Sequence, residues 1–164
     1  MQIYKKLVSL SWHLGFVCEG LDGVFKDGPL SVSWVKSPYK DRWFADPFIL
    51  DATEDFIYLL AEEFRYVSPK GRIAKLTIDR HLFEIIDLKI VLEEQTHLSF
   101  PNILRKNGKV YVYPENANGG KQNLYEYDEE NEKLVFVQAW KRRSRETLGS
   151  DLCLTPDNFL FLTL

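Results

Sequence analysis

One pattern occurs twice in this sequence, about 50 residues apart. The first copy consists of Ala45–Leu50 and Ile57–Glu62, and the second of Phe100–Leu104 and Val110–Glu115. In both copies a proline precedes an Ile-Leu pair, and a tyrosine is followed four residues later by a glutamate. A fainter third copy spans 150–164. A repeat of about this length is typical of one four-stranded blade of a β-propeller.

The segments between the matching stretches predict the remaining strands of each repeat. Arg72–Asp79 alternates apolar and polar residues, as a half-buried strand does, and Asn123–Asp128 is its counterpart. Leu82–Val91 and Lys133–Val137 are the candidate outer strands, and turn signals separate the segments. No long stretch has a helical apolar period. We therefore predict an all-β chain in which each repeat is an antiparallel meander.

These intervals give the expected organisation of a five-bladed-propeller-like domain. The predicted units are N-terminal strands in 1–40, a first blade at about 41–95, a second at 96–148 and the start of a third at 149–164. Ser31–Val35 alternates, and either completes the last blade or forms an outer strand of the first. Since propellers have about four to eight blades, we expect only the first two to three here. The apolar strand 159–164 would then be an open edge, covered by self-association or by further blades.

Composition and charge exclude several classes of function. A net charge of −3 with interspersed signs does not favour nucleic acid. No segment approaches the roughly 20 apolar residues that span a bilayer. Cys18 and Cys153 lie far apart and predict free thiols in a reducing, cytoplasmic compartment. The three histidines lack metal-ligand spacing, so we expect neither a metal nor a cofactor.

The repeat predicts where chemistry would take place. Inner strands of a propeller line one funnel, so we expect Asp46, Asn102 and Asp151 to converge there. Converging carboxylates suit glycoside hydrolysis, in which one group protonates the leaving oxygen and another activates water or attacks the sugar. We expect Asp46 to act as base or nucleophile and Glu115 as acid. A turn-capping role for Asp46 and a solvated strand end for Glu115 are the structural alternatives.

Three further residues are candidate saccharide ligands. Glu62 ends a second strand near the same face as Glu115, and His97 precedes an inner strand. Trp43 is placed to stack on a sugar ring, although core packing is the commoner use of tryptophan. A hydrogen-bonded structural role is the alternative for His97.

The motif Ala45-Asp46-Pro47 resembles the A-D-P of family 43 glycoside hydrolases, five-bladed propellers that act on arabinosides and xylosides. The resemblance implies that Asp46 is a general base. Ser99–Ile103 and Gly108–Tyr113 look like the family's W-A-P-D-(V/I) and G-K-Y-Y-L-Y motifs. Asn102 stands where that family has a second aspartate, and the family's general-acid glutamate belongs to a later blade.

A second resemblance extends over about residues 40–164. The sequence is similar to the N-terminal propeller-like domain of glucosamine inositolphosphorylceramide transferases and their bacterial relatives, at Trp43–Phe48, Glu62-Glu63, Lys70–Ile73, His97–Pro101 and Tyr113–Glu115. This resemblance implies a carbohydrate context.

Three functions follow as expectations. The first is a glycoside hydrolase-like domain that acts on or binds a saccharide or glycoconjugate in a central funnel, which Asp46, Glu62 and Glu115 favour. The second is a non-catalytic carbohydrate-binding or scaffold domain associated with a glycosyltransferase, which Asn102 favours. The third is a protein-interaction propeller unrelated to sugars.

Overall fold

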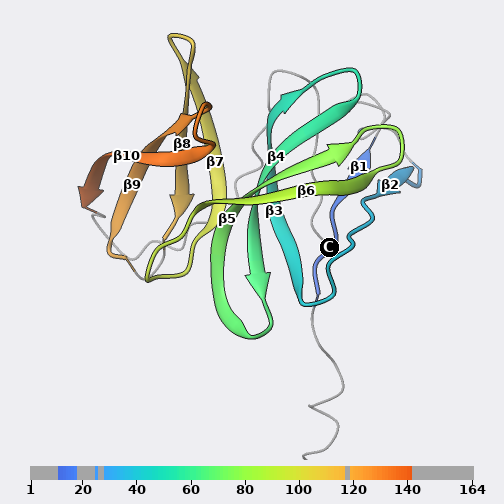
Figure 1. Cartoon of the computed structure of the whole chain (residues 1–164), viewed down its shortest axis with the longest axis horizontal. Coiled ribbons are helices and arrows are strands. Elements are labelled where there is room, and N and C mark those ends of the chain that lie inside the picture. The colour runs from blue at the N-terminus through green and yellow to red at the C-terminus, as the bar shows by residue number, and fades with distance from the viewer. Residues whose placement is uncertain (1–10, 18–24, 26–27, 117–118, 142–164) are drawn as a thin grey trace, which may run out of the picture.

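The computed structural model describes residues 11–17, 25, 28–116 and 119–141, and these residues form ten β-strands and no helix (Figure 1). The strands are β1 (Gly15–Val17), β2 (Val32–Trp34), β3 (Arg42–Ala52), β4 (Phe56–Arg65), β5 (Ser68–Asp79), β6 (Glu84–Leu92), β7 (Ser99–Lys106), β8 (Lys109–Glu115), β9 (Lys121–Asp128) and β10 (Lys133–Lys141). No helix in this part of the chain is therefore available to cross a bilayer.

Eight of the strands form two antiparallel meanders. The first sheet has the order β3-β4-β5-β6, and the second has the order β7-β8-β9-β10. Each sheet follows the chain order from an inner edge, β3 or β7, to an outer edge, β6 or β10. This confirms the prediction of an all-β chain and of four strands in each of the first two repeats.

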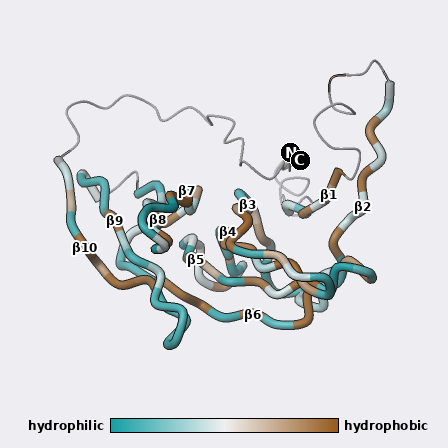
Figure 2. Tube along the Cα trace, turned by 90° about the horizontal axis from the view of Figure 1, so that it is seen from above, coloured by the Kyte–Doolittle hydropathy of each residue, from teal (hydrophilic) through white to brown (hydrophobic). Residues whose placement is uncertain are grey.

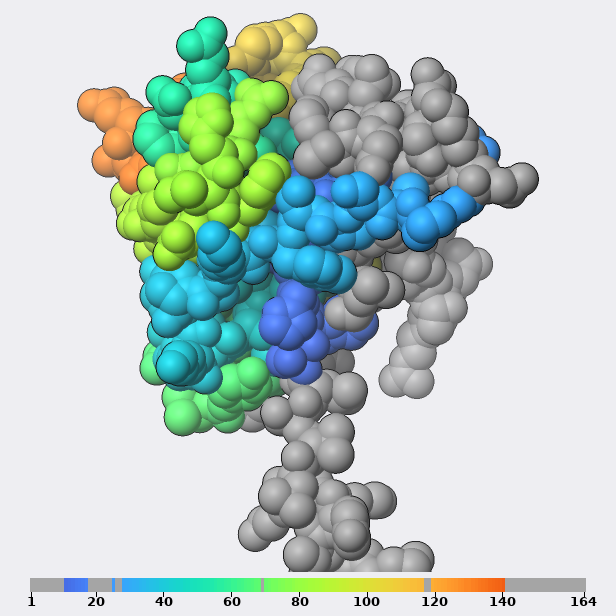
Figure 3. Space-filling model, turned by 90° about the vertical axis from the view of Figure 1, so that its right-hand side faces the viewer, coloured from blue at the N-terminus to red at the C-terminus, as the bar shows by residue number. Residues whose placement is uncertain are grey.

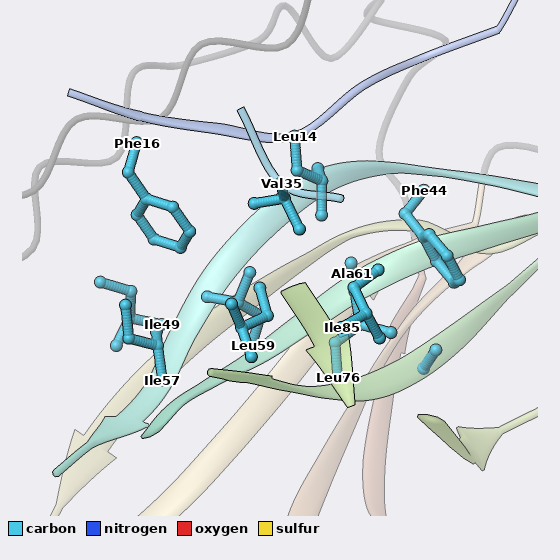
Figure 4. Packing of buried hydrophobic residues seen from close by; sticks show 12 residues of the cluster. Leu14, Phe16, Val35, Phe44, Ile49, Ile57, Leu59, Ala61, Leu76 and Ile85 are labelled. Carbon is cyan, nitrogen blue, oxygen red and sulfur yellow. The ribbon is translucent and has the colours of Figure 1, made fainter. Parts of the chain in front are cut away.

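The first sheet is buried on both faces, which explains why its strands carry apolar residues at successive positions. Leu59 and Leu60 are neighbours on β4, point to opposite faces, and are both fully buried. On one face, Leu59, Leu76 and Phe44 pack beneath the N-terminal segment, which contributes Leu14 and Phe16 (Figure 4). β1 and β2 pair with one another above this face.

The opposite face of the first sheet packs on the second sheet. Leu50, Leu60 and Ile73 meet Val112 and Tyr125 in a second apolar core. The inner strands β3 and β7 are neighbours, and so are the outer strands β6 and β10 (Figure 2). Burying apolar area between sheets is the main favourable contribution to such a contact. The two meanders therefore stand face to face, each with its inner strand on the same side.

Several expectations lie beyond what this structure tests. No sheet closes into a ring among the described residues, so the five-bladed propeller stays a prediction. The third repeat at 149–164, its Asp151 and the edge at 159–164 lie outside the described residues. The alternating Ser31–Val35 segment does form a strand, β2, but its partner β1 was not singled out in the sequence.

Candidate functional site

A β-bulge in the inner strand of the first sheet directs Asp46. The register between β3 and β4 shifts between Ala45 and Phe48, and Asp46 has a φ of 49°. Bulges re-aim side chains, and they also accommodate a proline, which cannot donate to the strand ladder. Pro47 follows and is buried. The Asp-Pro pair therefore fixes a local turn of the backbone that a regular strand would not have.

The inner strand of the second sheet, β7, has the same kind of β-bulge before a proline. The register between β7 and β8 shifts between Ser99 and Asn102, and Phe100, which precedes Pro101, has a φ of 44°. Phe100, and not Asn102, is thus the structural counterpart of Asp46. Asn102 pairs with Tyr113 and donates from Nδ2 to the Phe100 carbonyl at 3.1 Å.

The buried carboxyl group of Glu62 lies near Asp46 and perturbs its pKa. Burial, the charge of Glu62 and a side-chain hydrogen bond with Glu62 raise the pKa of Asp46 to about 7. A hydrogen bond from the Phe100 backbone N–H opposes the shift, and Glu115 adds to it. Below about pH 7 Asp46 is therefore mainly protonated and can donate a hydrogen bond.

His97 contacts the other side of Glu62, which is 5% exposed. Its Nδ1 accepts a hydrogen bond from the Gly71 N–H at 2.9 Å, so the ring proton sits on Nε2 in the neutral tautomer. Nε2 lies 3.2 Å from Oε1 of Glu62. The interaction with Glu62 raises the pKa of His97, and burial of the ring opposes this shift. In the neutral tautomer His97 therefore turns its Nε2–H side toward the Glu62 carboxylate.

Position 71 has no room for a side chain, because backbone and side-chain atoms of the site pack against the α-carbon of Gly71. A Cβ at this position would lie 2.3 Å from the Leu98 carbonyl oxygen, 2.7 Å from Oε1 of Glu62 and 2.8 Å from Cε1 of His97. The Leu98 N–H also donates to the Gly71 carbonyl at 3.0 Å. Glycine thus permits the close approach of the 97–98 segment to β5, which places His97 beside Glu62.

Aromatic rings extend from this cluster along the first sheet. Trp43 stacks on Phe64, with ring centroids 4.6 Å apart and an interplanar angle of 8°. Phe64 in turn lies 6.3 Å from the ring of His97. Trp43 and Phe64 are both partly exposed. Partly exposed aromatic rings therefore lie beside the carboxylate cluster.

The structure brings together some of the predicted residues and leaves others apart. His97 lies 3.2 Å from Glu62, and both Glu62 and Glu115 perturb the pKa values of Asp46 and His97. Trp43 reaches the cluster only through Phe64. The contacts described for Asn102 do not include Asp46.

Sequence reasoning missed Phe64, Gly71 and Phe100 as parts of the site. Gly71 falls within Lys70–Ile73, a segment quoted for a family resemblance, but nothing in it indicates an approach to His97. The proline match between the repeats contained a signal for Phe100, because aligning Pro47 with Pro101 places Asp46 opposite Phe100.

The adjacent glutamate, Glu63, has a different role on the opposite face of β4. It is fully buried and binds two arginines, with Nη1 of Arg42 at 2.8 Å from Oε1 and Nη2 of Arg72 at 2.8 Å from Oε2. Arg42 is also held by Asp41 at 2.8 Å, and Arg72 by Glu93 at 3.0 Å. These pairs compensate the buried charge of Glu63 and leave Glu62 as the carboxylate available to Asp46.

The cluster offers hydrogen-bonding and proton-transfer groups. Among the residues that the structure describes, no group of three or more side chains could hold a metal ion. Pockets of about 220 and 550 Å³ lie elsewhere among the described residues, and neither is lined by Asp46, Glu62 or His97. The carboxylates can accept hydrogen bonds from hydroxyl groups, and Asp46 can donate one when protonated.

Comparison with known proteins relates the chain to one family. Residues 30–138 match the family model described as "Glucosamine inositolphosphorylceramide transferase 1, N-terminal". The chain is 36% identical over 111 residues to glucosamine inositolphosphorylceramide transferase 1 of Arabidopsis thaliana. That match covers 66% of this chain and 13% of the Arabidopsis protein, so the chain corresponds to a small part of its relative. No solved structure matches the chain.

Proposed function

Because the chain belongs to the family of the glucosamine inositolphosphorylceramide transferase 1 N-terminal region, we propose that it is a carbohydrate-binding domain that serves a glycosyltransferase. The observation that supports this function is the Asp46–Glu62 pair, in which the pKa of Asp46 is raised, with His97 at 3.2 Å from Glu62 and an aromatic ring beside it. Carboxylates that accept hydroxyl protons, together with rings that pack on C–H faces, form a common kind of saccharide site.

The geometry favours binding over hydrolysis. Glycosidases separate their two carboxyl groups by about 5–10 Å to leave room for the sugar bond or for water. The buried Glu62 lies close enough to Asp46 to raise its pKa, which argues for a smaller separation of the two carboxyl groups than a glycosidase needs. Glu115 influences Asp46 only through its charge. A protonated Asp46 near Glu62 suits the recognition of sugar hydroxyls, because the two groups can both donate and accept hydrogen bonds.

Glycoside hydrolysis is the second candidate function, and the pKa of Asp46 favours it. A carboxyl group with a pKa of about 7 matches a general acid that works near neutral pH. Glu115 would then be the partner carboxylate, and the sugar would have to separate Asp46 from Glu62.

We further propose that the two sheets are successive blades of a five-bladed propeller. Three observations support this arrangement: the repeated bulges at Asp46 and Phe100, the adjacent inner strands, and the repeated meander. Arg105 of β7 joins the inner strands by donating to the carbonyls of Ile49 and Leu50, at 3.2 and 2.7 Å. In such a ring the Asp46 cluster would lie near the funnel between the first two blades.

A binding and turnover experiment separates the two functions. The full chain is titrated by calorimetry with methyl glucopyranoside, glucosamine and myo-inositol, and is assayed on aryl furanosides and pyranosides. We expect saccharide binding without turnover, and about tenfold weaker binding for Glu62→Gln. Glu93→Gln, an exposed member of the separate arginine network, is the matched control and should bind like the wild type. Turnover that Asp46→Asn abolishes would establish the hydrolase instead. The absence of binding to every saccharide tested would overturn the binding function.

A further inference from the structure

A separate pocket of about 220 Å³ opens on the other face of the first sheet. The N-terminal segment Ser11–Leu14 forms one side of it, and the start of β3 forms another. Phe44 and Val35, which belong to the first apolar core, contribute to its lining. Figure 3 shows the side of the molecule on which the N-terminal segment and β2 lie. Asp46, Glu62 and His97 do not line this pocket, but Trp43, which reaches their cluster through Phe64, does.

Two of the lining side chains are held in place by their neighbours. Arg42 donates to both carboxylate oxygens of Asp41 at 2.8 Å and to Glu63 at 2.8 Å. Its guanidinium lies 5.1 Å from the ring centroid of Tyr39. Tyr39 also meets Phe44 edge-on, with centroids 6.0 Å apart. Binding therefore does not have to order Tyr39 or Arg42, and this lowers its entropic cost.

Two aromatic residues at this pocket remain largely exposed to solvent. Trp12 is 41% exposed and Tyr66 is 45% exposed. Ser11, His13 and Ser37 also contribute to the lining and bring hydroxyl and imidazole groups. Exposed aromatic faces next to hydrogen-bonding groups suit a ligand that is apolar on one face and hydroxylated at its edge, as a sugar ring is.

The charge and the volume of the pocket limit the class of ligand that it can bind. The charge of Arg42 is already balanced by Asp41 and Glu63. Lys40 is exposed, so water screens its charge. The pocket is smaller than the roughly 300–1,000 Å³ typical of drug-sized ligands. These properties favour one uncharged ring over an acidic sugar, a phosphate or an oligosaccharide.

We propose that the pocket between Trp12, Tyr39 and Tyr66 binds a single neutral sugar ring. The inference rests on the proposed carbohydrate-binding function and assigns a second contact point, on the face opposite to the Asp46 cluster. A saccharide or glycoconjugate would then be recognised at two places on the first sheet.

The test compares two tryptophan variants of the full chain. Trp12→Ala removes a ring at the pocket, and Trp34→Ala removes a ring that is 47% exposed and lies outside it. Methyl glucopyranoside is titrated into each by calorimetry, and urea unfolding confirms that both variants fold. We expect Trp12→Ala to weaken binding about tenfold and Trp34→Ala to leave it within about twofold. Tyr66→Ser, which changes an exposed side chain, should also weaken binding if the pocket is the site.

The outcomes distinguish this inference from the function on which it rests. Equal affinities for the two tryptophan variants and for Tyr66→Ser, with binding still sensitive to Glu62→Gln, would overturn the pocket and leave the proposed function standing. Glucuronate or glucose 6-phosphate that binds more than about tenfold tighter than methyl glucopyranoside would overturn the neutral ligand. A wild-type chain that binds none of these probes would overturn both proposals.

Discussion

Asp46 and Phe100 occupy the same place in the two sheets, each with a positive φ, 49° and 44°, and each followed by a buried proline. The backbone of Phe100 also favours the ionised form of Asp46 and so lowers its pKa. One repeat thus supplies a titratable group, and the backbone of the next repeat influences its ionisation. Positive φ at residues other than glycine is uncommon and often accompanies functional sites. The repeat therefore explains both the position and the environment of Asp46.

The free energy of unfolding should decrease as the pH rises toward 7, because of Asp46. Its pKa is about 7 in the folded protein against an ordinary value of 3.8. Between these values the folded state binds more protons than the unfolded state, so stability falls with rising pH. The raised pKa of His97 acts in the same direction, since its stabilising contribution is complete at low pH and is lost as the pH rises through the folded-state pKa.

Asp46→Asn should remove much of this dependence. Asparagine stays neutral and its carbonyl still accepts from Phe100. Urea unfolding at pH 5, 6, 7 and 8 should show the variant gaining stability relative to the wild type as the pH rises. Parallel pH profiles for the two proteins would show that Asp46 is not ionising in this range.

Gly71→Ala should destabilise the protein by about 3 kcal/mol, near the upper end for overpacking, because the added methyl meets the rigid Leu98 carbonyl. Gly108→Ala is the control. Gly108 has a φ of 74° and open space around it, so alanine there incurs only backbone strain of about 1–2 kcal/mol. Urea unfolding measures both variants. If Gly71→Ala lowers the free energy of unfolding less than Gly108→Ala does, the 97–98 segment must move away easily to accommodate the methyl group.

Glu63→Gln should destabilise the protein by about 3 kcal/mol, because it leaves the partly buried Arg42 and Arg72 without their shared counter-charge. Glu93 also binds Arg72, but its side chain is 48% exposed. Glu93→Gln should therefore change the free energy of unfolding by less than about 1 kcal/mol. Similar losses for the two variants, measured by urea unfolding, would contradict the assignment of Glu63 as the centre of the network.

Leu50→Ala and Leu104→Ala test the packing of the two sheets at equivalent positions of the repeat. Leu50 is 7% exposed and packs on the second sheet, whereas Leu104 is 51% exposed on the far face of that sheet. We expect Leu50→Ala to lower the free energy of unfolding by about 2–5 kcal/mol. Leu104→Ala should change it by no more than about 0.5 kcal/mol. A large loss at Leu104 in thermal or urea unfolding would indicate that another apolar surface covers this face.

The sequence by itself determined the meanders, because strand periodicity and turn residues are local properties. Alternation in Arg72–Asp79 and turn signals such as Asn107-Gly108 predicted strands that the structure confirms. The repeat also matched Glu62 with Glu115, which occupy equivalent positions in the two sheets, but it matched Asp46 with Asn102, where the structure places Phe100. Local patterns of this kind depend on residues close together in the chain, so a single sequence is enough to detect them.

Only the tertiary structure decided which groups meet Asp46. The side chain of Glu62 and the backbone of Phe100 reach it from β4 and β7, and His97 reaches Glu62 because Gly71 has no side chain. The difference between Glu62 and Glu63 was likewise invisible in the sequence, since two adjacent identical residues point to opposite faces of β4. One faces a carboxyl and the other faces two arginines. The raised pKa of Asp46 and the neutralisation of Glu63 by two arginines both depend on distances across strands, which sequence spacing does not specify.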